Sequence, residues 1–142
     1  IRKFIASDVL SKIYLSSVQP CIVYACSVWG NCSVFNKNMV LRLQKRAARI
    51  VTGNFDYIDT RGFDLMKELR WQTFDIRRDY FISTLMYKSI YGQAPTWLTN
   101  NILMACESHD VDTRNSSGMN VLVPKPNVES FRKSFQYQGS AL

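Results

Sequence analysis

The strongest pattern in the sequence is a helical periodicity between Asn36 and Val51. Gly53 predicts the end of this helix, because glycine readily adopts the left-handed backbone that terminates helices. Ser33 or Asn36 can cap its start with a side-chain oxygen. Apolar residues recur three and four positions apart, which predicts that one side of the helix is buried. The members of this apolar side are Met39, Val40, Leu43, Ala47, Ile50 and Val51.

The opposite side of the same helix is cationic. Arg42, Lys45, Arg46 and Arg49 follow the spacing i, i+3, i+4, i+7, and no acidic residue interrupts them. At about 100° per residue, the four fall within an arc of roughly 100°. Two interpretations stay open. The cations neutralise the phosphates of a nucleic-acid backbone, or they form a solvated surface whose long side chains cover the flanks of the helix.

Residues 21–29 are apolar on nearly all sides, which fits a buried helix or a buried strand. Pro20 before them and Gly30 after them favour the helix. Apolar spacing and capping residues predict further helices at residues 7–18, 63–69, 73–91 and 95–103. Within the helix at 73–91, Tyr80, Tyr87 and Tyr91 form a stripe that fits packing or base stacking.

The expected fold is therefore mainly α. A compact bundle of about five to six helices is predicted over residues 1–105, with an irregular tail over residues 106–142. Short β-like runs are expected in that tail, such as Met119–Val123, which Pro124 ends. The first residue is not a methionine, and the pattern of the tail stops before it is complete, so we expect a fragment of a longer protein.

The charge of the chain favours a polyanionic partner. Its 142 residues carry 18 Lys and Arg against 11 Asp and Glu, a net charge of +7. A basic balance of this size is typical of nucleic-acid binding, although many basic proteins bind none. No apolar run approaches the twenty residues of a membrane span, and no secretory signal is recognisable. We expect no membrane partner and an intracellular location, nuclear or cytoplasmic.

No catalytic or metal site is predicted. The acidic residues are scattered, and Asp75 and Asp79 alternate with Arg77 and Arg78, which is typical of a solvated charged face. Glycine-rich phosphate loops and a serine nucleophile motif are absent from the sequence. Cys106 and the single histidine, His109, lack a second pair of zinc ligands. The cysteines are expected to be free thiols in a reducing compartment, and they are Cys21, Cys26, Cys32 and Cys106.

The order of several short motifs is similar to a known family. These motifs are Gln19-Pro20, Trp29-Gly30-Asn31-Cys32, Leu43 to Val51, Leu69-Arg70-Trp71, Arg77-Arg78, Met86-Tyr87-Lys88, Ala94-Pro95, Thr113-Arg114 and Ser134 to Gly139. In this order they resemble the region after the palm of the reverse transcriptases of non-LTR retrotransposons, the LINE-type and jockey-like elements. The resemblance covers nearly the whole chain.

The resemblance implies a parent enzyme that copies RNA into DNA, in some members with an endonuclease domain. Its catalytic aspartates and divalent metal, magnesium, would belong to the palm, so no cofactor is expected in this segment. A thumb or connector segment would grip the template–primer duplex and contact the rest of the polymerase. Carried onto this sequence, the phosphate contacts are Arg42, Lys45, Arg46 and Arg49, with Arg77 and Arg78 as weaker candidates. Two alternatives remain: a stand-alone helical protein-interaction domain, and a decayed retroelement remnant without a selected function.

Overall fold

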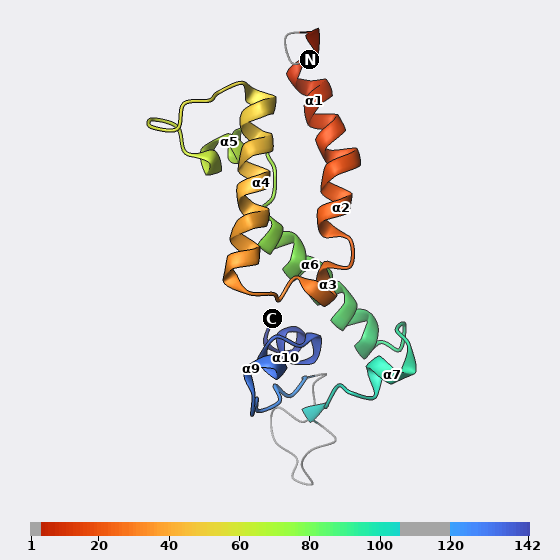
Figure 1. Ribbon diagram of the computed structural model, residues 1–142. Coiled ribbons are helices and arrows are strands. Elements are labelled where there is room, and N and C mark those ends of the chain that lie inside the picture. Colours follow the sequence, from red (N-terminus) through yellow and green to blue (C-terminus); the bar gives the residue numbers. More distant parts are fainter. Residues whose placement is uncertain (1–3, 106–119) are drawn as a thin grey trace. The chain divides into compact units, whose positions relative to one another are not determined.

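The computed structural model describes residues 4–105 and 120–142, and these residues are mainly helical (Figure 1). This confirms the helical fold class predicted from the sequence. The chain divides into two compact units, Ile1–Arg78 and Asp79–Leu142, and the division falls inside helix α6 (Phe74–Ile90). The expected boundary near residue 105 borders residues 106–119, which lie outside the described residues, and it stays a prediction.

In the N-terminal unit, the long helix α4 lies beside the helical rod that contains α1 and α2, and α5 packs along α4 (Figure 1). Ser33 caps α4 by accepting a hydrogen bond from the backbone N–H of Asn36, and Gly53 ends it with a φ of 79°. The predicted start and end signals of this helix are thereby confirmed. The elements of the unit are α1 (Ser7–Ile13), a π-helical turn η2 (Tyr14–Val18), α2 (Gln19–Val23), α3 (Cys26–Trp29), α4 (Val34–Thr52), α5 (Gly62–Glu68) and the start of α6.

Two expectations about the first thirty residues are wrong. Pro20 lies in the first turn of α2, as expected, but it does not separate this helix from the one before it, because the chain widens into the π-helical turn η2 and continues into α2. A proline ring clashes with a carbonyl in the preceding helical turn, and a wider turn relieves such a clash. The predicted helix at residues 21–29 is broken at Ala25, whose φ of 50° is left-handed. Of this stretch, Cys26 is buried, whereas Tyr24 and Val28 are about four-fifths exposed.

The buried side of α4 also differs from the predicted one. Leu43, Met39 and Ile50 are exposed by 58%, 46% and 43%, so the prediction that they face the core is wrong. The residues of α4 that are buried are Gln44, Ala48, Arg49 and Val51, and of these Val51 alone belongs to the predicted apolar side, so its burial is confirmed. The cause is the position of the neighbouring elements, since α1 and α5 both contact α4 and cover that other side. Helical periodicity identifies a stripe of residues but not the elements that cover it.

The core of this unit centres on two stacked aromatic rings. Tyr14 and Trp71 lie with ring centroids 3.9 Å apart and nearly parallel, among Ala48, Val51 and Leu65. Gln44 is buried beside them and uses both ends of its amide. Its Nε2 donates to the hydroxyl of Tyr14 (3.4 Å) and the carbonyl of Gln72 (3.5 Å), and its Oε1 accepts from the backbone N–H of Phe74 (2.9 Å). A buried amide is stable in a core only when its donors and acceptor are paired in this way.

Burial of Tyr14 makes the unit sensitive to alkali. Desolvation raises the pKa of its phenol above the ordinary value of 10.0, against a smaller lowering by the hydrogen bond from Gln44. Above pH 10 the unfolded chain therefore releases this proton while the folded chain retains it, so stability falls as the pH rises towards the folded pKa. Urea unfolding at pH 8 and pH 10.5 should show a larger loss in the wild type than in Tyr14→Phe. Equal losses would contradict this role.

The C-terminal unit contains the rest of α6, α7 (Thr96–Thr99), α9 (Glu129–Arg132) and α10 (Phe135–Ala141). The expected β-like run at Met119–Val123 appears, within the described residues, as one isolated antiparallel bridge between Met104 and Val121. Tyr80, Tyr87 and Tyr91 are all more than half exposed, and the last two rings contact each other. Across the described residues, none of the helices has both the length and the apolar character needed to cross a membrane.

Candidate nucleic-acid interface

A cleft of about 380 Å³ lies along α4, where the helix meets the loop at residues 53–61 and the start of α5. All of its lining belongs to the N-terminal unit, and four of the six lining residues are the cations predicted from the sequence. The 19-residue helix holds these cations on one rigid rod, which its two caps define. The lining residues are Arg42, Lys45, Arg46, Arg49, Tyr57 and Gly62.

Arg42 and Arg46 are exposed, and Lys45 is half-buried. The ammonium of Lys45 lies 3.8 Å from the centre of the Phe63 ring, and its aliphatic stem packs on Gly62. A Cβ at Gly62 would approach the Lys45 stem to 2.9 Å, so glycine permits this close contact between α4 and α5. Among the described residues, no ion pair is formed by these three cations. Their charge is therefore available to an anionic ligand.

Arg49 differs from the other three cations and corrects the prediction of one exposed cationic face. Its side chain is buried, with 5% of the residue exposed. Its guanidinium donates to the carbonyls of Asn54 (3.3 Å), Asp56 (2.6 Å) and Thr60 (2.7 Å). These bonds tie the loop back onto α4 and cover the arginine. The structure therefore gives Arg49 the role of holding the loop rather than that of a free phosphate contact.

The loop is also held by its own side chains. Asn54 accepts a bond from the backbone N–H of Asp56 and donates to the hydroxyl of Thr60. The carboxylate of Asp56 accepts from the N–H groups of Ile58 (2.8 Å) and Asp59 (3.2 Å), and these bonds lower its pKa below the ordinary value. Such bonds between short polar side chains and nearby N–H groups stabilise turns. The loop thus has a defined conformation beside the cations.

Arg77 and Arg78 do not belong to this cleft. Arg78 is buried, donates to the carboxylate of Asp75 at 3.0 Å, and lies within 3.5 Å of the carbonyl of Gly30. It packs so closely on Gly30 that a Cβ there would lie 2.8 Å from its stem. Arg77 is half-buried, and its Nε has no hydrogen-bond partner in the described part of the chain. The contacts of Arg78 are therefore structural, and the expectation that Arg77 and Arg78 are weaker phosphate contacts stays a prediction.

Sequence reasoning missed three residues of this site, Tyr57, Gly62 and Phe63. The loop at residues 53–61 is polar only in part. Tyr57 is 71% exposed, and the guanidinium of Arg49 lies 4.2 Å from the centre of its ring. The available signal was the presence of large apolar side chains between turn-forming residues. The position of this loop, and with it Tyr57, beside α4 follows from the hydrogen bonds of Arg49. The sequence does not reveal these bonds.

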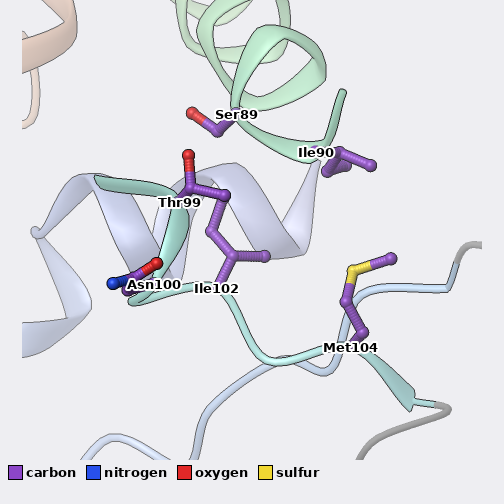
Figure 2. Close-up of a pocket in the computed structure, with 6 residues that line it drawn as sticks. All are labelled: Ser89, Ile90, Thr99, Asn100, Ile102 and Met104. Atoms are coloured by element: carbon purple, nitrogen blue, oxygen red, sulfur yellow. The ribbon is translucent and has the colours of Figure 1, made fainter. Parts of the chain in front are cut away.

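A second cavity, of about 400 Å³, lies within the C-terminal unit (Figure 2). Its lining is neutral, with a serine, a threonine and an asparagine beside apolar side chains. The hydroxyl of Ser89 donates to the carbonyl of Leu85, and among the described residues that line the cavity none is titratable and could activate it. Nucleophilic catalysis requires such an activating base. The lining residues are Ser89, Ile90, Thr99, Asn100, Ile102 and Met104.

No group of three or more His, Cys, Asp or Glu side chains is placed to hold a metal ion in residues 4–105 and 120–142. Cys21, Cys26 and Cys32 are free thiols. Burial raises the pKa of the Cys26 thiol, which keeps it protonated and unreactive. Cys106 and His109, the one pair considered for zinc, lie outside the described residues. The predicted absence of a metal and of catalysis therefore stays a prediction.

In comparisons with known proteins, no family model matches this chain, and neither a curated protein nor a solved structure matches it.

Proposed function

We propose that this chain is the accessory segment after the palm of a non-LTR retrotransposon reverse transcriptase, and that it grips the template–primer duplex. The observation that carries the proposal is the cluster of Arg42, Lys45 and Arg46 on one rigid helix, at the edge of a cleft and without acidic partners in the described chain. The succession of motifs from Gln19-Pro20 to Gly139 supports the identity of the parent enzyme. Polymerisation would belong to that parent, and this segment would supply binding.

The contacts expected of such a grip are to phosphates. Arg42 and Arg46 are one helical turn apart, about 6 Å along the axis, which is close to the spacing of neighbouring phosphates on one strand. Cations that replace condensed counterions on a duplex add affinity without reading its sequence. A polymerase needs that property, because it must hold every product that it makes. Arg49 would support the grip indirectly by fixing the loop that forms the other wall of the cleft.

Replacing Arg42 and Arg46 together with alanine is expected to weaken binding to an RNA–DNA duplex and to flatten its salt dependence. Each phosphate contact contributes about 0.9 to the slope of log K against log salt. With three phosphate contacts, the wild type should lose affinity about 40-fold when the salt concentration rises from about 50 to 200 mM. The double variant keeps only the contact of Lys45, and its affinity should fall about threefold to fourfold over the same range. Fluorescence anisotropy with a labelled duplex measures both values.

A matched control separates this grip from a general effect of charge. Lys12→Ala with Lys88→Ala removes two positive charges as well, from exposed positions that do not line the cleft. This control should keep the wild-type affinity and slope. The proposal fails if wild-type binding is independent of salt, or if the control loses as much affinity as the Arg42 and Arg46 variant.

A second candidate function, protein docking, is favoured by the exposed apolar side chains of α4. Phe35, Met39, Leu43 and Ile50 lie next to Arg42 and Arg46 on the same helix, and each is more than two-fifths exposed. An apolar stripe of this kind is typical of a surface that another protein covers. The partner that fits the proposed identity is the polymerase core of the same enzyme. When the two parts are coexpressed, Leu43→Glu should abolish their copurification, whereas the Arg42 and Arg46 variant should preserve it.

A further inference from the structure

Beyond a duplex grip, the cleft along α4 has the features of a site for a single unpaired nucleotide. Its volume of about 380 Å³ is near the lower end of the range for ligand pockets, about 300–1,000 Å³, and suits one nucleotide rather than a stretch of duplex. Its lining combines cations with one exposed aromatic ring, Tyr57. Proteins that hold single strands use this combination, with cations along the backbone and aromatic rings under the bases.

We propose that the cleft binds one unpaired nucleotide next to a duplex, with its base stacked on Tyr57 and its phosphate bound by Arg42 and Arg46. The inference rests on the proposed function, because the same cations hold the adjoining duplex. The inference adds an aromatic contact to the phosphate contacts. It also names a class of ligand that phosphate contacts alone do not predict, a duplex with a single-stranded extension.

The ring of Tyr57 is suited to stacking because it is both exposed and fixed. The Arg49 guanidinium lies 4.2 Å from the ring centre, while 71% of the residue remains exposed, so much of the ring is free to receive a base. Arg49 holds the flanking backbone through the carbonyls of Asp56 and Thr60. The loop therefore presents the ring in one position, and binding does not have to order it first.

A base inside a duplex cannot use this ring. Inside a duplex, each base is stacked on both faces by its neighbours, and an aromatic side chain reaches a face only after that stacking is disrupted. An unpaired terminal nucleotide has a free face and a flexible backbone. The exposed guanidinium groups of Arg42 and Arg46 line the same cleft as the ring, so one nucleotide can contact the ring and the cations together.

The test compares RNA–DNA duplexes that differ only at one end, using the full chain. One duplex is blunt, one carries a single unpaired 2-aminopurine at a 3′ or a 5′ end, and one carries an abasic unit there. The 2-aminopurine extension should bind about fivefold or more tightly than the blunt end, and its fluorescence should be quenched by stacking. Tyr57→Ala should remove both effects, so that the extended and the blunt duplex bind this variant with equal affinity. Tyr57→Phe should retain both, because stacking uses the ring.

Tyr80→Ala is the matched control, since it removes another exposed tyrosine that does not line this cleft. Circular dichroism of each variant checks that the helical fold is retained. If neither extension binds more tightly than the blunt duplex, or the abasic extension binds as well as the base, the inference is overturned while salt-dependent duplex binding still supports the proposed function. If no duplex binds at all, both are overturned.

Discussion

Replacing Trp71 with alanine is expected to lower the free energy of unfolding by about 3–5 kcal/mol, the usual loss when a large buried aromatic residue is removed. Trp71 is 7% exposed, and its ring is stacked on Tyr14 at 3.9 Å between elements that are distant in sequence. Its indole N–H also donates to the hydroxyl of Ser11 at 3.2 Å. The substitution therefore leaves a cavity and removes the contact that joins α1 to the segment before α6.

Urea unfolding followed by far-UV circular dichroism measures this loss. Trp97→Ala is the matched control, because Trp97 is 69% exposed and its removal should change stability by no more than about 0.5 kcal/mol. Trp71→Phe should lie between the two, since it keeps a ring against Tyr14 but loses the bond to Ser11. Similar unfolding midpoints for the two alanine variants would contradict the core described above.

Replacing Arg49 with methionine is expected to lower the free energy of unfolding by about 2–4 kcal/mol. Methionine preserves much of the buried stem but removes the donors to the carbonyls of Asn54, Asp56 and Thr60. Hydrogen bonds from a charged donor contribute more than neutral ones, and partly buried acceptors left unpaired add a desolvation cost. Arg49→Lys should be nearly as harmful, because one ammonium cannot reproduce the fork of a guanidinium.

A second measurement localises the effect to the loop. Chymotrypsin cleaves after aromatic residues, and Phe55 and Tyr57 are exposed in a loop that Arg49 holds in place. Limited digestion should therefore cut Arg49→Met at these positions much faster than the wild type. The control is Arg46→Met, which changes another arginine of the same cationic row. Because Arg46 is exposed, this variant should unfold and be digested like the wild type. Equal behaviour of the two variants would show that the loop does not depend on Arg49.

The stability prediction for Arg49 and the two binding predictions separate the residues of the cleft by role. Arg42 and Arg46 should affect binding and leave stability nearly unchanged, because their guanidinium groups are exposed. Arg49 should affect stability first, and binding through the loop. Tyr57 should determine the preference for a ligand with an unpaired base. These three variants, the Arg42 and Arg46 double variant, Arg49→Met and Tyr57→Ala, therefore test whether the cleft is a ligand site or a solvated surface of the helix.

Much of the local structure could be predicted from the sequence. The start of α4 at Ser33 and its end at Gly53, and the end of α6 before Gly92, depend on capping groups and on backbone freedom. Both are properties of neighbouring residues, so the sequence contains them. The helical class and the exposed cations Arg42 and Arg46 were predicted from the spacing of residues along the chain, which is also a local property. The helical path was expected to end before Pro20, but it continues, because the wider π-helical turn η2 relieves the steric clash of the proline ring.

The tertiary structure alone decided which side of α4 is buried. Gln44 lies in the core because Tyr14, Gln72 and Phe74, about thirty residues away in either direction, pair with its amide. Leu43 is exposed because α1 and α5 cover the other side of the helix. Sequence periodicity gives the spacing of side chains, but the cost of burying a polar group depends on its partners, and these are known only once the chain has folded. Arg49 shows the same effect of tertiary partners. The sequence placed it in a row of surface cations, whereas the carbonyls of the folded loop pair with its guanidinium, so that it holds Tyr57 beside the cleft.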